Sequence, residues 1–218
     1  MGVDTKDAPL NSANQRQKTM ASPAQKISVS AGDALIVVDM QNDFLPGGSL
    51  AVPDGDAVVP VLNRYLAEFS ARELPVYATR DWHPANHCSF KAQGGPWPPH
   101  CVAESPGAQF AALLRFPSGT LVISKATQPD KDAYSGFEGT DLDARLRALN
   151  IKRLFVGGLA TDYCVLNTVR DARRLDYDVY LLSDAIRAVN INPDDGPKAE
   201  AEMQHLGAKP ITLAALGT

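Results

Sequence analysis

The chain has 218 residues, of which 44% are hydrophobic, and its formal net charge is −4. This length suits one ordinary α/β domain, and two full domains would be cramped. Acidic and basic residues are well mixed, so there is no electrostatic reason to bind nucleic acid or an anionic membrane, and the expected partner is a small molecule.

The N-terminal residues 1–28 are polar and show no sustained hydrophobic period. We expect them to form a flexible extension ahead of a single domain over residues 29–218. They lack the apolar core of a secretory signal, and no apolar run approaches the length of a membrane span, which predicts a cytoplasmic protein. The sequence is silent on oligomeric state, and a homo-oligomer stays open.

Short apolar runs alternate with helical patterns from Asp33 onward. Runs typical of buried strands occupy residues 34–38, 75–78, 121–123, 154–156, 179–182 and 210–212. Helical patterns occupy residues 56–70, 141–149, 162–175 and 195–206. The alternation predicts an α/β fold with a Rossmann-like parallel sheet of about six strands and helices on both faces.

Reactive side chains follow three of the predicted strands. Asp39 closes the first strand, Lys125 closes the third, and Cys164 follows the fourth through a turn over residues 157–163. In a parallel sheet the carboxyl ends of all strands lie at one edge, where ligands bind. We therefore expect these three side chains to converge.

Cys164 is the candidate nucleophile. Thr161 or Asp162 is expected to cap the following helix, which would place Cys164 in its first turn. The helix dipole and Lys125 would then favour the thiolate, and the free N–H groups of that turn could hold an oxyanion. The alternative is a buried structural cysteine, an interpretation that Asp39 and Lys125 at matching strand ends disfavour.

The segment 81–119 is rich in Pro, Gly, His and Trp and is too long for a simple connection. Asp81 and His83 lie two residues apart, and His87 and His100 follow them. One aspartate with two histidines is a common ligand set for Zn²⁺ or another divalent ion that keeps open positions.

Two other interpretations of this loop stay open. Cys88 and Cys101 each follow a histidine, as in a closed structural zinc site, although C-x-x-C spacing is absent. In a metal-free alternative the histidines only donate and accept hydrogen bonds within the loop.

Several aromatic residues lie in loops or at strand ends, where an exposed ring needs a reason. These are Phe44, Trp97, Tyr134 and Phe137. A flat heteroaromatic ligand would stack on such rings, and core filling beneath a long loop is the simpler alternative.

Four stretches resemble motifs of nicotinamidases of the pyrazinamidase type, in the isochorismatase-like hydrolase superfamily. They are residues 38–50 (VDMQNDFLPGGSL), 79–102 (from TRDWHP to GGPWPPHCV), 125–137 (with DAYSGF) and 158–165 (GLATDYCV). The likeness runs from about residue 33 to 213. The metal loop distinguishes nicotinamidases from isochorismatases, which lack that ligand set.

The resemblance implies the isochorismatase-like hydrolase fold and hydrolysis of nicotinamide to nicotinate and ammonia in NAD salvage, through a cysteine thioester. It implies that Asp39, Lys125 and Cys164 form the catalytic triad. A cis peptide would precede Ala160, whose N–H would form the oxyanion hole with that of Cys164.

The resemblance also implies a metal ion that orients the pyridine ring, with zinc expected and iron or manganese as alternatives. Asp81, His83 and His100 would be its ligands, and His87 would be a fourth ligand or a donor to metal-bound water. The expected pocket lining is Phe44, Trp97 and Tyr134. Two rival functions stay open: another cysteine amidohydrolase acting on a ureido or carbamoyl compound, and a non-catalytic metal-binding scaffold.

Overall fold

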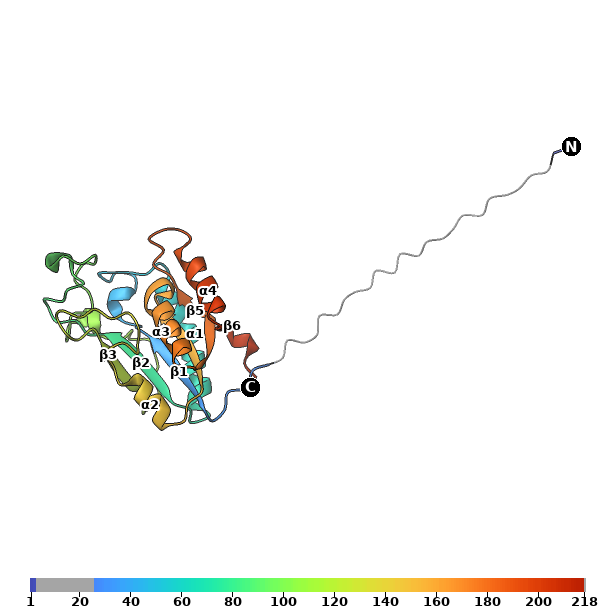
Figure 1. Cartoon of the computed structure of the whole chain (residues 1–218), viewed down its shortest axis with the longest axis horizontal. Helices are drawn as coiled ribbons and strands as arrows, with labels where there is room; N and C mark the ends of the chain where they lie inside the picture. Colours follow the sequence, from blue (N-terminus) through green and yellow to red (C-terminus); the bar gives the residue numbers. More distant parts are fainter. Residues whose placement is uncertain (3–25, 218) are drawn as a thin grey trace.

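A computed structural model describes residues 1–2 and 26–217 (Figure 1). Most of the expected N-terminal extension over 1–28 therefore lies outside the described residues. At the border of the domain, Ile27 pairs with Leu216 in an isolated parallel bridge and donates its N–H to the carbonyl oxygen of Ala215 at 2.8 Å. Among the described residues, the first contacts of the domain therefore join Ile27 to the C-terminal segment.

Six parallel strands form one sheet in the order β3-β2-β1-β4-β5-β6 (Figure 1). Their bounds are β1 Asp33–Val38, β2 Val76–Asp81, β3 Leu121–Lys125, β4 Arg153–Leu159, β5 Asp178–Arg187 and β6 Lys209–Ile211. All six predicted strands are confirmed. However, β2, β3, β4 and β5 run further toward their carboxyl ends than the predicted apolar runs, because polar residues and glycines that end these runs still pair with the neighbouring strand.

Helices cover both faces of the sheet, as predicted. They are α1 Val58–Ser70, α2 Leu142–Ala148, α3 Leu166–Arg174 and α4 Asp195–His205. Helix α1 packs against one face, and α2, α3 and α4 pack against the other. Short 3₁₀ helices span Asn42–Phe44, Gly55–Ala57, Lys91–Gln93, Pro106–Ala108 and Leu213–Ala215. In the described part of the chain, no helix has the length and apolar character needed to cross a membrane.

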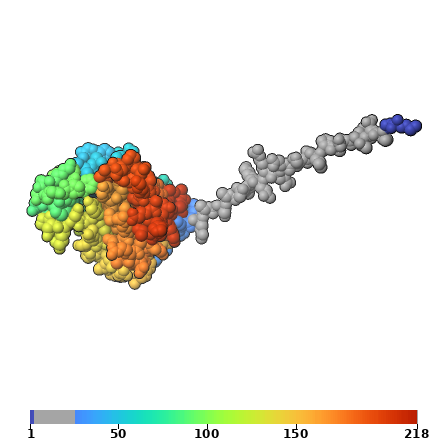
Figure 2. Space-filling view, turned by 45° about the horizontal axis from the view of Figure 1, so that its top comes forward, coloured from blue at the N-terminus to red at the C-terminus, as the bar shows by residue number. Residues whose placement is uncertain are grey.

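The strand order places a topological switch between β1 and β4. The connection after β1 crosses one face through α1, and the connection after β4 crosses the other face through α3. A crevice opens outside the carboxyl ends of the two strands at such a point, and ligands bind there. The residues around 81–119, green in Figure 2, cover this end of the domain.

Close approach of β4 to β1 at the switch requires a glycine. Gly158 has a φ of +126°, and a Cβ atom there would lie 2.1 Å from the carbonyl oxygen of Val38. Only a residue without a side chain fits this position, so the sequence Gly157-Gly158 lets the end of β4 turn beside β1.

Candidate active site

Asp39, Lys125 and Cys164 converge at the switch point, as expected from their positions after β1, β3 and β4. The Lys125 Nζ atom lies 3.0 Å from Asp39 Oδ2 and 3.5 Å from Cys164 Sγ. All three side chains are buried. Residues 39, 125 and 164 are far apart in the sequence but form one cluster, because the carboxyl ends of parallel strands lie at one edge of the sheet.

The Lys125 ammonium group is enclosed by acceptors. It pairs with Asp81 Oδ1 as well as Asp39, and it donates to the carbonyl oxygen of Ala133 at 3.1 Å. Burial by itself would lower the pKa of Lys125, but the two carboxylates raise it well above its ordinary value. Lys125 is therefore a permanent cation at this site.

The thiol of Cys164 differs from the expected thiolate. Burial raises the pKa of Cys164 well above its ordinary value, with Lys125 opposing this change and Asp39 adding to it. Burial also raises the pKa of Asp39, opposed by Lys125 and aided by Asp81. A protonated thiol beside a carboxylate of raised basicity suits proton transfer from sulfur to Asp39 at the moment of attack.

The orientation of the Asp39 carboxylate is set by the backbone conformation of Asp39 and by a hydrogen bond from the Thr79 hydroxyl. Asp39 has a left-handed φ of +45°, which is uncommon for a residue with a side chain. Thr79 Oγ1 donates to Asp39 Oδ1 at 2.6 Å. The left-handed φ turns the chain at the end of β1, and the hydrogen bond from Thr79 orients the carboxylate toward Lys125.

The turn that holds Cys164 departs from the sequence expectation. Residues Thr161–Val165 form a π-helical turn ahead of α3, so Cys164 does not lie in the first turn of an α-helix. Neither Thr161 nor Asp162 caps the turn with its side chain, and Ala160 occupies the N-cap position. The N-cap prediction is therefore wrong, because the Asp162 carboxylate accepts the backbone N–H groups of Val189 and Asn190 instead. The peptide before Ala160 is cis, as the resemblance implied.

Asp81, His83 and His100 form a second buried cluster, with one potential ligand atom of each lying within 4.8 Å of the others. Asp81 Oδ2 lies 3.7 Å from His83 Nε2, too far for a hydrogen bond. His83 Nε2 is buried and has no hydrogen-bond partner among the described residues. His100 Nδ1 lies 2.8 Å from the carbonyl oxygen of Pro98, which leaves its Nε2 as the ligand nitrogen. This donor set fits a divalent cation.

His87 lies beside this cluster and outside it. Its Nδ1 is 2.7 Å from Ser89 Oγ and its Nε2 is 3.0 Å from the carbonyl oxygen of Lys131. Its ring stacks on that of His83 with centroids 4.2 Å apart. Because both nitrogens are occupied by protein partners, the geometry favours a supporting position for His87 over direct ligation.

A closed zinc site of cysteines and histidines finds no support. Among residues 1–2 and 26–217, the groups with metal-ligand spacing are Asp81–His83–His100 and Asp39–Asp81–Cys164, and neither contains Cys88 or Cys101. The second group surrounds the Lys125 ammonium, so a cation already occupies its centre.

A pocket of about 360 Å³ opens onto both clusters. It is lined by Cys164, Asp81, His100 and Ala160, by the predicted aromatic residues Phe44, Trp97 and Tyr134, and by Leu50, Tyr163 and Val189. Trp97 Nε1 donates to the Tyr134 hydroxyl at 2.9 Å, which fixes the two rings relative to each other. Apolar walls with a few convergent polar groups are typical of a substrate site.

The pocket residues Leu50, Tyr163 and Val189 were not predicted from the sequence. Tyr163 directly precedes Cys164 and could have been found from that position, but the loop after β5 that supplies Val189 shows no signal in the sequence. For Phe137 the core-filling alternative holds, since its ring stacks on that of Tyr177 with centroids 6.0 Å apart and packs against the core.

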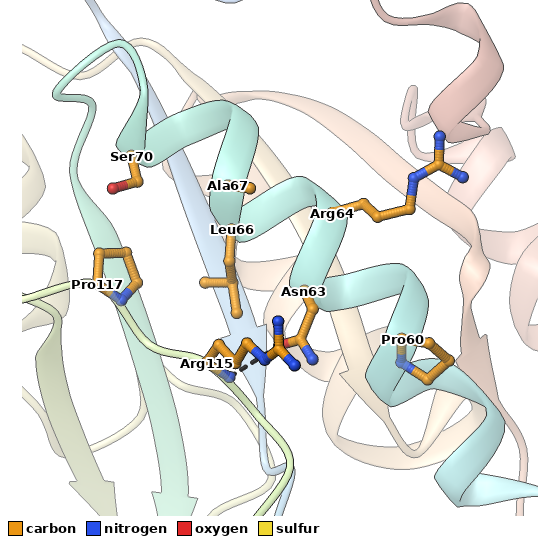
Figure 3. A pocket seen from close by; sticks show the side chains of 8 residues that line it. All are labelled: Pro60, Asn63, Arg64, Leu66, Ala67, Ser70, Arg115 and Pro117. Atoms are coloured by element: carbon orange, nitrogen blue, oxygen red, sulfur yellow. Dashed lines mark hydrogen bonds between the residues drawn. The ribbon is translucent and has the colours of Figure 1, made fainter.

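A larger and more open hollow of about 910 Å³ lies between α1 and residues 115–117 (Figure 3). The Asn63 side chain in this hollow is already engaged, since it donates to the carbonyl oxygen of Leu113 and accepts from the backbone N–H of Arg115. No member of either reactive cluster lines it, so the smaller pocket is the candidate active site.

Comparison with known proteins agrees with this geometry. Residues 33–215 match the isochorismatase domain family. The chain is 45% identical over 202 residues to the nicotinamidase of Escherichia coli (strain K12), covering 83% of this chain and 95% of that protein. It therefore belongs to the isochorismatase family of hydrolases, and the fold expected from the resemblance is confirmed.

Two solved structures narrow its place in that family. The pyrazinamidase of Pyrococcus horikoshii in complex with zinc has a TM-score of 0.80 and 49% identity, covering 84% of this chain and 99% of that one. PnC1 from L. infantum in complex with nicotinate has a TM-score of 0.82 and 39% identity, covering 88% and 98%. The chain is thus similar to nicotinamidases and pyrazinamidases, which are hydrolases acting on amides.

Proposed function

We propose that the protein hydrolyses nicotinamide to nicotinate and ammonia, a reaction of NAD salvage. One observation supports this most strongly: Cys164 lines the same pocket as Asp81 and His100 of the ligand cluster. A nucleophile and a cation site that face one small aromatic pocket suit a substrate with an amide and a basic ring nitrogen. The similarity to nicotinamidases supports the same conclusion.

Asp81, His83 and His100 would hold the metal, with zinc expected because a related pyrazinamidase binds it, and iron or manganese as alternatives. When bound, the ion would supply a Lewis-acidic anchor for the pyridine nitrogen. The rings of Phe44, Trp97 and Tyr134 would enclose the flat substrate and exclude water.

Catalysis begins with proton transfer from the Cys164 thiol to Asp39, as the sulfur attacks the carboxamide carbon. The backbone N–H groups of Ala160 and Cys164 stabilise the resulting oxyanion. Lys125 stabilises the charge on Asp39 and on the sulfur, which lie 3.0 and 3.5 Å from its Nζ.

The tetrahedral intermediate collapses when the amide nitrogen takes the proton from Asp39 and leaves as ammonia. A thioester on Cys164 remains. Asp39 then removes a proton from water, whose oxygen attacks the thioester carbon, and nicotinate leaves as the thiol is restored.

The test is ammonia release from nicotinamide by the wild type and by Cys164→Ala, with Cys88→Ala as the matched control outside the pocket. We expect activity in the wild type and the control and none above background in Cys164→Ala, whose circular dichroism spectrum should be unchanged. Substantial turnover by Cys164→Ala contradicts the nucleophile. A wild type that prefers ureido or carbamoyl compounds to nicotinamide points to another amidohydrolase, and one that hydrolyses no amide points to a scaffold.

A further inference from the structure

One wall of the pocket comes from the connection between β5 and α4, which leads over the top of the domain in Figure 1. Val189 lies in this connection, lines the pocket and packs against the core beneath α1. Ile191, two residues further, is 61% exposed. The connection therefore presents one aliphatic side chain to the pocket and another to solvent.

A single carboxylate ties this wall to the turn of the nucleophile. Asp162, two residues before Cys164, accepts the backbone N–H of Val189 through Oδ1 and that of Asn190 through Oδ2, each at 2.9 Å. Hydrogen bonds to an ionised acceptor are stronger than neutral ones, and two parallel bonds also fix orientation. Asp162 thus sets where Val189 stands relative to Cys164.

The opposite side of the connection is held by α4. Asn190 Oδ1 accepts the backbone N–H of Gly196 at 2.8 Å, and a Cβ atom on Gly196 would lie 2.8 Å from the Cβ of Ala188. Asn190 itself has a left-handed φ of +53°. The backbone on either side of Val189 is therefore held between the turn of Cys164 and α4, and moving it to admit a wider substrate would break these contacts.

We propose that Val189 is a specificity-determining residue, which sets how much room the pocket leaves beside the ring of an aromatic amide. Asp162 is the positioning residue that holds it there. The substrate class is thereby narrowed to small aromatic amides without bulky ring substituents. This inference rests on the proposed function, because it assumes that an aromatic amide occupies the pocket.

The test compares kcat/KM for nicotinamide with kcat/KM for nicotinamides methylated at each free ring carbon. In Val189→Ala, the ratio of methylated to parent kcat/KM should rise about tenfold or more for at least one isomer, the usual effect of room for one methyl group. In Val189→Leu the same ratio should fall. The matched control is Ile191→Ala, which removes an aliphatic side chain from the same connection and should leave every ratio unchanged.

The positioning role is tested with Asp162→Ala and the conservative Asp162→Asn, which keeps one oxygen acceptor. Asp162→Ala should shift the isomer ratios in the direction of Val189→Ala, and Asp162→Asn should restore part of the wild-type preference. The control is Asp195→Ala, because Asp195 accepts the backbone N–H of Asn192 at 2.8 Å within the same connection and does not line the pocket. If Asp162→Ala does not fold, the isomer ratios of Asp162→Asn are compared with those of Asp195→Ala. A shift in Asp162→Asn alone supports the positioning role, and unchanged ratios in both variants overturn it.

Each outcome has a distinct meaning. Ratios that stay within about twofold of the wild type in both Val189 variants overturn the specificity role, since one methyl group normally has a larger effect. Lower turnover of Asp162→Ala with unchanged ratios overturns the positioning role. A wild type that releases no ammonia from nicotinamide overturns the proposed function and this inference together, whereas an active wild type with unchanged ratios overturns the inference alone.

Discussion

Asp39 and Lys125 form an ion pair with 3.0 Å between Oδ2 and Nζ, and neither side chain is exposed to solvent. Removing two charges from water costs several kcal/mol for each ion, and good geometry with additional partners is needed to offset this cost. Asp81 and the carbonyl oxygen of Ala133 supply those partners to the ammonium. The site is therefore a network of one cation and two carboxylates, in which each member depends on the others.

Lys125→Met should destabilise the protein by about 3–5 kcal/mol, because it leaves the buried carboxylates of Asp39 and Asp81 without their cation. Urea unfolding followed by circular dichroism measures the change. Arg145→Met is the control, since it breaks the solvent-exposed pair between Arg145 and Asp141 and should leave the unfolding free energy unchanged. Equal stability of the two variants would contradict a buried charge network.

Removal of the metal should abolish ammonia release, and addition of a divalent ion should restore it, since the ligand cluster faces the pocket. Activity before and after dialysis against a chelator, with metal content measured in parallel, checks this. Activity that survives complete removal of metal would exclude the ion from the reaction.

The two stacked histidines should differ in their effect on metal affinity. His83→Ala removes a ligand nitrogen and should weaken zinc binding by about 100-fold or more, whereas His87→Ala removes only a neighbour and should weaken it by about tenfold at most. Competition with a chromogenic chelator measures both affinities without relying on activity. Equal losses would show that His87 moves to bind the ion directly.

Two buried tyrosines offer a matched pair for stability. Tyr65 donates its hydroxyl to Asp184 Oδ1 at 2.8 Å, whereas the Tyr77 hydroxyl has no hydrogen-bond partner among the described residues. Tyr65→Phe should cost roughly 1–3 kcal/mol, because the carboxylate loses its donor, and Tyr77→Phe should be neutral or stabilising. Urea unfolding of both variants tests the difference, and the reverse order of stability would contradict it.

The close approach at Gly158 predicts a severe effect of a single methyl group. Gly158→Ala should cost roughly 1–3 kcal/mol from overpacking against Val38 in addition to backbone strain, and it should lower activity because Ala160 and Cys164 follow. Gly119→Ala is the control, because Gly119 also has a positive φ, +91°, but has open space around it. Thermal unfolding of both separates the clash from the strain, and similar losses would argue against the contact.

The sequence by itself determined the order of strands and helices along the chain and singled out the candidate reactive side chains. Apolar runs and helical spacing reflect burial directly, and because parallel strands end at one edge of the sheet, the positions of Asp39, Lys125 and Cys164 in the sequence predict that they lie together. The spacing of Asp81, His83 and His100 likewise indicated a cation site.

Only the tertiary structure decided how these groups behave. The pKa of Cys164 is raised because the fold buries its thiol, and the Nε2 partner of His87, the carbonyl oxygen of Lys131, comes from another loop. Asp162, expected to cap a helix, instead holds Val189, which lies 27 residues further along the chain. Local patterns cannot encode such contacts, because burial and hydrogen-bond partners are set by segments that meet only after the sheet has formed.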